Sequence, residues 1–280
     1  MESFDGNTTG QMVVAAFATD VAAKAIIITG ASKVDLASNE SVRHAAVKIN
    51  ALPDLDHIDI VINAAGNMAV RTYQASADGF ELQFAANHLG HFLLTKLILD
   101  KILAASAPTV VNLTSMGYEL AECNFEDPNF NAGRVHGNAY DPWLAYSQAK
   151  TANILHVLGL YDKFGHKGLA TFAVHPGYVS ESQLECNNGV DTDLMIAGYK
   201  LAVARNDDKS STLLFEEKVH PSIKEYATNK QNAKKLWDLS EKLGDRSMHA
   251  TLNSTCEELR ITFRELVNIV SSIPSDVPHL

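Results

Sequence analysis

Four short apolar runs, each followed by small or polar residues, constrain the fold of this chain more than any other feature. The runs are rich in β-branched residues, which is typical of strands buried in a parallel sheet. Segments of helical length separate them, and this alternation predicts an α/β fold with a mostly parallel, doubly wound sheet that has helices on both faces. The predicted strands are Ala25–Ile28, Ile58–Ile62, Thr109–Leu113 and Leu169–Val174.

The predicted helices lie between and after these strands. The segment Ser254–Ile273 is amphipathic, and Pro274 marks its end. No repeat or low-complexity linker divides the chain, so we expect one domain over residues 1–244 and a helical C-terminal extension, not a separate domain, over residues 245–280. The other predicted helices are Ser41–Leu52, Gly79–Ala105, Ala145–Phe164, Asp191–Arg205 and Asn232–Leu243.

Charge and composition exclude several classes of partner. The net charge is −10 and the basic residues are scattered, which argues against nucleic acid or an anionic membrane as a partner. No apolar run approaches the roughly 20 residues of a membrane helix, and the polar N-terminus is not typical of a secretory signal. The three cysteines form no CxxC motif, which fits a reducing compartment, so we expect a cytoplasmic protein.

Two further patterns have mainly structural interpretations. His88 and His91 lie three apart on one predicted helix, a spacing that metals can use. No carboxylate or cysteine completes a ligand set beside them, so we expect no metal site. The aromatic residues of the stretch 117–144 either pack locally or line an apolar substrate pocket; they are Tyr118, Phe125, Phe130, Tyr140 and Trp143.

The strongest chemical signal is Tyr146 followed four residues later by Lys150 at the start of a predicted helix. Residues four apart share one face of a helix. A lysine ammonium beside a phenol stabilises the phenolate and is expected to lower its pKa. Such a tyrosine can exchange a proton with a substrate oxygen, which is general acid–base catalysis. In isolation the pair is weak evidence, because many surface helices carry it by chance.

Other residues at the ends of the predicted strands make the Tyr146 and Lys150 pair stronger evidence for a catalytic site. Ser115 stands just past a predicted strand, where its hydroxyl can orient a substrate oxygen. The strand before it ends in Asn63–Gly66, whose small residues let a flat cofactor approach the backbone. Asn87 lies inside a predicted helix, where a bound water linking it to Lys150 would explain it. All these strand ends meet at one edge of a parallel sheet, the edge where ligands bind in open α/β folds.

These residues resemble the signatures of the short-chain dehydrogenase/reductase family. Thr29–Ser32 resembles the start of its glycine-rich cofactor loop, and Asn63–Gly66 resembles its structural motif. The gap from Ser115 to Tyr146 and the stretch Tyr140–Tyr146 are similar to the branch of retinol dehydrogenases and WW-domain oxidoreductases, especially its fungal members. The resemblance implies a Rossmann-like fold and hydride exchange between NAD or NADP and an alcohol or carbonyl substrate.

The resemblance also implies roles for individual residues. Tyr146 would exchange the proton, Lys150 would lower its pKa and hold the nicotinamide ribose, and Ser115 would polarise the substrate. A homo-oligomer that pairs through the Gly79–Ala105 and Ala145–Phe164 helices is a further family expectation. The implied catalytic residues are Asn87, Ser115, Tyr146 and Lys150. The implied cofactor-binding residues are Gly30, Ser32, Asp35, Asn63, Ala64, Ala65, Gly66, Tyr146, Lys150, Pro176 and Gly177.

The chain departs from the family after Ser32. A dinucleotide loop needs further glycines, yet the sequence runs directly into Asp35–Ser38, which resembles the segment that follows the family's third strand. We therefore expect the family's second and third strands to be absent, together with the residue that selects NAD or NADP. Their loss would leave the first strand at an edge of the sheet.

Three functions are compatible with this sequence. The first is an NAD(P)-dependent oxidoreductase, which the Tyr146 and Lys150 signature favours. The second is a family-derived protein that does not use the cofactor, either a binding or regulatory subunit or a mis-spliced product; the missing loop favours this one. The third is cofactor-free acid–base chemistry, such as dehydration or isomerisation, at the same tyrosine.

Overall fold

The computed structural model of the protein describes residues 22–30, 34–130, 140–177 and 223–245, together with the backbone of four short strands. The chain divides into a unit Met1–Ser247, which contains all described residues, and a second unit Met248–Leu280. The predicted helices Asp191–Arg205 and Ser254–Ile273 lie outside the described residues. The predicted boundary between residues 244 and 245 stays a prediction.

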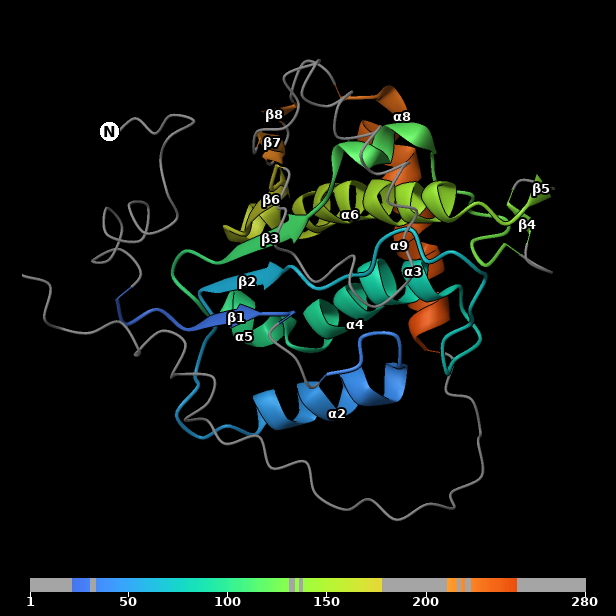
Figure 1. Cartoon of the computed structure of the whole chain (residues 1–280). Coiled ribbons are helices and arrows are strands. Elements are labelled where there is room, and N and C mark those ends of the chain that lie inside the picture. Colours follow the sequence, from blue (N-terminus) through green and yellow to red (C-terminus); the bar gives the residue numbers. More distant parts are fainter. Residues whose placement is uncertain are drawn as a thin grey trace, which may run out of the picture. The chain divides into compact units, whose positions relative to one another are not determined.

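The central sheet contains the four predicted strands in parallel (Figure 1). Two antiparallel strands, which the sequence did not reveal, extend it beyond the fourth: β7 (Ser211–Phe215) and β8 (Lys218–Val219). The expectation of a mostly parallel α/β sheet is therefore confirmed. The four parallel strands, in spatial order, are β1 (Ile26–Ile28), β2 (Ile60–Asn63), β3 (Thr109–Leu113) and β6 (Ala170–His175).

Strand β1 lies at an edge of this sheet, beside β2, which is the next strand along the chain. Among the residues described between them, the one helix is α2 (Asn39–Asn50), which begins at the N-cap Ser38, whose side chain accepts from Ser41 N. Ile28 at the end of β1 is 46% exposed. The predicted absence of two strands, with the first strand left at an edge, thus agrees with the described part of the sheet.

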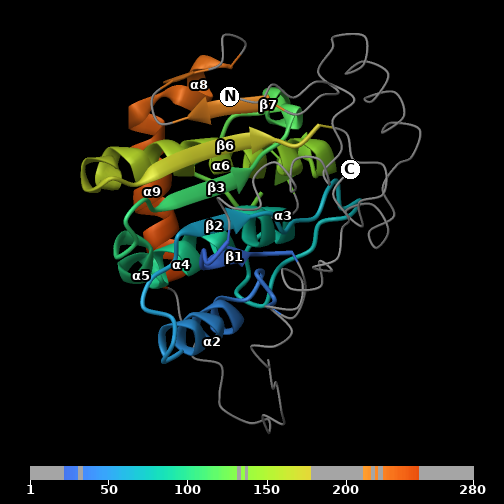
Figure 2. The same ribbon diagram turned by 90° about the vertical axis from the view of Figure 1, so that its left-hand side faces the viewer.

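The described helices cover one face of the sheet (Figure 2). Residues on that face, such as Val61, Val110 and Ala173, are fully buried, whereas the alternate residues of the same strands are half-buried. The prediction of helices on both faces is confirmed for this face only. The helices on it are α4 (Gly90–Leu97), α6 (Pro142–Phe164) and α9 (Lys230–Gly244), the last packed against the other two.

Trp237 of α9 fixes this helix layer. Its ring packs at 5.0 Å from the ring of Phe92 in α4 and at 6.2 Å from that of His156 in α6. Gly159 of α6 leaves room for it, because a Cβ there would approach the indole to 3.1 Å. The chain's own helix α9 therefore covers part of the α4 and α6 surface through which the resemblance implies pairing.

The predicted helix Gly79–Ala105 is divided into several elements. The π-helix η1 (Ala85–Leu89) interrupts it and contains Asn87, and a further break occurs at Ile98, whose φ of −107° is not helical. A π-turn inside a helix frequently marks a functional site. The remaining elements are α3 (Leu82–Phe84), α5 (Leu99–Leu103), the 3-10 helices η2 (Met116–Leu120) and η4 (Gly165–Lys167), β4 (Arg134–Val135), β5 (Asn138–Ala139) and α8 (Glu225–Thr228).

Candidate active site

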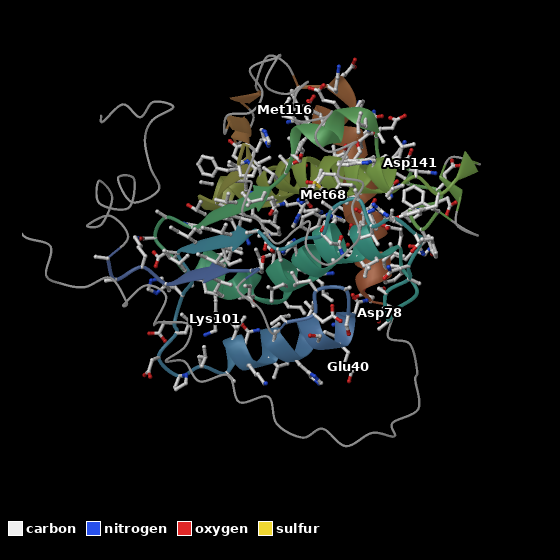
Figure 3. The ribbon with its side chains drawn as sticks, viewed as in Figure 1. Glu40, Met68, Asp78, Lys101, Met116 and Asp141 are labelled. Atoms are coloured by element: carbon white, nitrogen blue, oxygen red, sulfur yellow. The ribbon has the colours of Figure 1, made fainter. Side chains whose placement is uncertain are left out.

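The carboxyl ends of β1, β2, β3 and β6 meet at one edge of the sheet, and α6 begins beside it. Helix α6 starts three residues before its predicted position, because the Asp141 carboxylate accepts from Trp143 N and Leu144 N and Pro142 suits the first helical turn. Figure 3 shows Asp141 at this start. The described part of the chain contains every site residue predicted from the sequence except Ser32, which lies outside it.

Tyr146, Lys150 and Ser115 are brought together at this edge. The Ser115 side chain lies close enough to the Tyr146 phenol to influence its pKa, and the Lys150 ammonium lies 5.5 Å from the centre of the tyrosine ring. Lys150 Nζ also donates to the carbonyl oxygen of Leu113 at the end of β3, at 3.2 Å. Tyr146 and Lys150 are only 4% and 5% exposed. The strand end and the helix thus hold the three groups in a buried cluster.

Burial dominates the pKa values of this cluster. It raises the pKa of Tyr146 to about 12, although the hydrogen bond from Ser115 acts in the opposite direction. Burial also lowers the pKa of Lys150 to about 8. The expectation that Lys150 lowers the tyrosine pKa below its ordinary value is therefore wrong for this state, because desolvation of the phenolate outweighs the favourable contacts. At neutral pH the phenol keeps its proton.

Asn87 holds the chain segment that follows β2. Its Oδ1 accepts from Asn67 N at 2.8 Å and its Nδ2 donates to the Asn67 carbonyl at 2.9 Å. A Cβ on Gly66 would lie 2.6 Å from Asn87 Oδ1 and 3.8 Å from Lys150 Nζ, so this close approach requires glycine. The side chain of Asn87 therefore organises the backbone beside Lys150, in addition to any water that it binds.

The residues at the carboxyl ends of the parallel strands fit the nicotinamide end of a dinucleotide. Gly30 has a φ of +105°, and a Cβ on it would lie 3.3 Å from the backbone of Ala65, so the ends of β1 and β2 approach closely with no side chain between them. At the end of β6, Pro176 is exposed and Gly177 has a φ of +81°. Backbone at several strand ends is thus open to a flat ligand.

The adenosine end is not built in the same way. The described chain runs from β1 into α2 without forming the family's second and third strands. Strand β1 is therefore the outermost described strand on its side of the sheet. Asp35, which the resemblance implies as a cofactor-binding residue, is exposed, and its Oδ1 accepts from Ala37 N at 2.9 Å. The described residues therefore supply half of the expected cofactor site.

An apolar wall stands beside Tyr146. The Trp143 ring meets the Tyr146 ring edge-on, with 6.4 Å between their centres, and packs with Met68 and Ala69. Ala69 has a φ of +47°, an uncommon conformation for a residue with a Cβ. The sequence indicated a wall role for Trp143 among other aromatic residues, but it gave no signal for Met68 beyond its position just after Asn63–Gly66.

The described residues hold no group of three or more histidine, cysteine or acidic side chains placed to bind a metal ion. None of the described helices is long and apolar enough to cross a membrane.

Comparison with known proteins shows which family the chain resembles. The family model described as short chain dehydrogenase matches residues 9–124. Bovine (Bos taurus) retinol dehydrogenase 12 is 32% identical over 234 residues, which cover 76% of this chain and 69% of that protein. Human (Homo sapiens) retinol dehydrogenase 13 is 37% identical over 160 residues, covering 57% of this chain and 46% of that protein.

Comparison with a solved structure agrees with the sequence relatives. The crystal structure of an uncharacterised protein from Mycobacterium Paratuberculosis superposes with a TM-score of 0.55 at 31% sequence identity, covering 76% of this chain and 74% of that one. The chain spans about half the length of several curated relatives that it matches, such as the 46% of human retinol dehydrogenase 13. Its sequence and its parallel sheet together place the chain in the short-chain dehydrogenase/reductase family.

Proposed function

We propose that this protein is an NAD(P)-dependent oxidoreductase that interconverts an alcohol and a carbonyl compound at Tyr146. One observation carries the proposal: the phenol of the buried Tyr146 lies beside the Ser115 side chain, with the Lys150 ammonium 5.5 Å from its ring, at the ligand-binding edge of the sheet. Membership in the short-chain dehydrogenase/reductase family supports the same reaction class.

In the reduction of a carbonyl, the Tyr146 phenol donates its proton to the substrate oxygen, and the Ser115 hydroxyl positions that oxygen. A phenol with a pKa of about 12 holds its proton at neutral pH and is ready to act as the acid. The charged form of Lys150 then stabilises the phenolate that remains. Bound NAD(P)H would supply the hydride. Asn63–Gly66, Lys150, Pro176 and Gly177 would hold its nicotinamide end.

An apolar carbonyl compound suits this site best. Trp143 and Met68 form an apolar wall beside the Tyr146 ring. Curated relatives are named retinol dehydrogenases, and we propose the retinol–retinaldehyde pair as the first substrate to examine. The choice between NAD and NADP stays open, and the cytoplasmic location expected from the sequence stays a prediction.

A second candidate is favoured by one observation: β1 is the outermost described strand of the sheet, and the described residues do not form the family's second and third strands beside it. A protein built in this way would not retain the adenosine half of the cofactor. It would be either a binding or regulatory relative of the active enzymes or a catalyst of cofactor-free proton transfer at Tyr146.

The two candidate functions differ in whether a hydride moves from the cofactor to the carbonyl carbon of the substrate. The full-length chain is incubated with retinaldehyde and with NADPH, or NADH, that carries deuterium at the hydride-donating carbon. We expect retinol with one deuterium on the former carbonyl carbon, detected by mass spectrometry, because the hydride moves directly from the cofactor. Absence of labelled product with both cofactors, across retinaldehyde and other apolar aldehydes and ketones, would favour the second candidate.

A further inference from the structure

His91 of α4 lies between two segments of the proposed site that are far apart in the sequence. Its imidazole is buried, with 1% exposure. Its Nε2 is 2.7 Å from the Thr29 hydroxyl at the end of β1, and its Nδ1 is 3.0 Å from the backbone carbonyl oxygen of Asn87 in the π-helix η1. One ring therefore contacts both the start of the cofactor loop and the turn that carries Asn87.

The surrounding hydrogen bonds determine where the protons lie. Thr29 Oγ1 accepts from Ala64 N at 2.9 Å and from Ala65 N at 3.1 Å, so both of its acceptor positions are used. Its own proton must then be donated to His91 Nε2. The Nδ1 atom carries the proton of the neutral ring and donates it to Asn87 O. This arrangement admits one tautomer and gives each bond a fixed direction.

Both ends of this link control geometry at the site. Through Thr29, the link fixes Ala64 and Ala65 against β1, where Gly30 approaches Ala65 closely. At its other end it fixes the peptide unit of Asn87, whose side chain holds Asn67 with two hydrogen bonds. The ring thus joins the backbone that would receive the nicotinamide to the residue that borders Lys150.

We infer that His91 is a positioning residue that couples the Thr29–Gly30 end of the cofactor loop to the Asn87 turn of the catalytic centre. The inference rests on the proposed function. The chain supplies no further glycine between Gly30 and Gly66, so the glycine-rich loop that the resemblance implies after β1 is incomplete. The contact between Thr29 and His91 holds the end of β1 from the side of α4.

Two substitutions separate the two halves of the link. His91→Gln places an amide oxygen near the Nε2 position, so it keeps the bond from Thr29 and loses the bond to Asn87. His91→Asn places an amide nitrogen near the Nδ1 position, so it keeps the bond to Asn87 and loses the bond from Thr29. A matched control is His88→Gln, because His88 is also buried one turn away but bonds Ser240 of α9, with 2.8 Å between Nε2 and Oγ.

The expected results differ between the variants. His91→Asn should weaken NADPH binding about 5- to 10-fold with a smaller change in kcat, and His91→Gln should lower kcat about 5- to 10-fold with a smaller change in NADPH affinity. His88→Gln should lower the midpoint of thermal unfolding without changing NADPH affinity and kcat to different extents. Equal changes of affinity and kcat in both His91 variants, or none in either, would overturn the coupling and leave His91 a structural core residue.

Two further measurements need no activity, so they decide the inference even if the proposed function fails. Nitrogen NMR of the histidine-labelled chain should show His91 protonated at Nδ1 only, and protonation at Nε2 would contradict the inference. Amide hydrogen exchange at Ala64 and Ala65 should become faster in His91→Asn than in His91→Gln. Equal exchange in the two variants would show that Thr29 does not depend on His91. Failure of the wild-type chain to reduce any carbonyl would instead count against the proposed function alone.

Discussion

Replacing Tyr146 with phenylalanine should lower the rate of carbonyl reduction about 10³-fold, because the change removes the group that protonates the substrate oxygen. The phenol is buried beside the Ser115 side chain, and it is protonated at neutral pH since burial raises its pKa to about 12. No other described acidic proton lies in this cluster except that of Lys150, whose pKa is lowered to about 8 by burial and whose Nζ already donates to Leu113 O. Steady-state kinetics of the variant and the wild-type chain at neutral pH measures the effect.

The matched control is Tyr161→Phe on the same helix. Tyr161 is half-buried near the C-terminal end of α6, where its ring packs beside Gly165. The same atom is removed outside the site, so kcat should stay within about 2-fold of the wild-type value. If Tyr146→Phe kept more than about a tenth of wild-type activity, proton transfer would have to come from another group.

The fold should lose stability steeply in mild acid, because burial lowers the pKa values of three histidines and keeps them neutral. His88, His91 and His156 are each at most 2% exposed, and the rings of His88 and His156 are 5.7 Å apart. Burial, the largest cause in each case, lowers the pKa of His91 to about 4 and that of His156 to about 3, and it holds the pKa of His88 well below its ordinary range. Neighbouring histidines add to the shift of His88 and His156.

The direction in which stability changes with pH depends on whether the folded or the unfolded chain binds the protons more readily. In the unfolded chain these side chains take up protons below about pH 6.5, whereas in the folded chain His91 and His156 stay neutral until the pH approaches 4. The stabilisation is therefore complete above about pH 6.5 and is lost as the pH falls. Each histidine contributes about 1.4 kcal/mol per pH unit, so His91 and His156 together give about 4 kcal/mol of loss at about pH 5, and His88 acts in the same direction. That is a large part of the free energy of unfolding of many domains.

Urea unfolding between about pH 7.5 and pH 5 checks this expectation. His156→Gln should reduce the pH slope by about a third, because one of the three titrating groups is gone. His44→Gln changes an exposed histidine of α2 and should leave the slope as it is in the wild-type chain. An unfolding free energy that stays constant over this range would show that the buried histidines do not remain neutral in the fold.

Much of the fold was predictable from local pattern. The apolar run Thr109–Leu113 is the observed β3, and the other three strands shift by two residues or fewer at either end. Small or polar residues after each run predicted that Asn63–Gly66, Ser115 and Pro176–Gly177 would meet at one edge. Such features were accessible because parallel strands place their carboxyl ends together whatever the details of packing.

Features that depend on packing were not predictable. The bond between Thr29 and His91 joins residues 62 positions apart, and no periodicity records it. Helical pattern alone predicted a continuous helix where Asn87 lies in a π-turn. The spacing correctly predicted that Tyr146 and Lys150 lie together, but the pKa of Tyr146 is raised and not lowered. The extent of desolvation, which decides this pKa, is set by the folded surroundings and not by the spacing of the two residues.

Titration of the purified full-length chain with NADPH and with NADH, followed by the fluorescence of the reduced nicotinamide, tests the central claim most directly. The account predicts saturable binding of at least one cofactor with a dissociation constant in the micromolar range, because the nicotinamide end of the site is assembled at the strand ends. No binding of either cofactor up to millimolar concentration would contradict it, and Tyr146 would then have no hydride donor to work with.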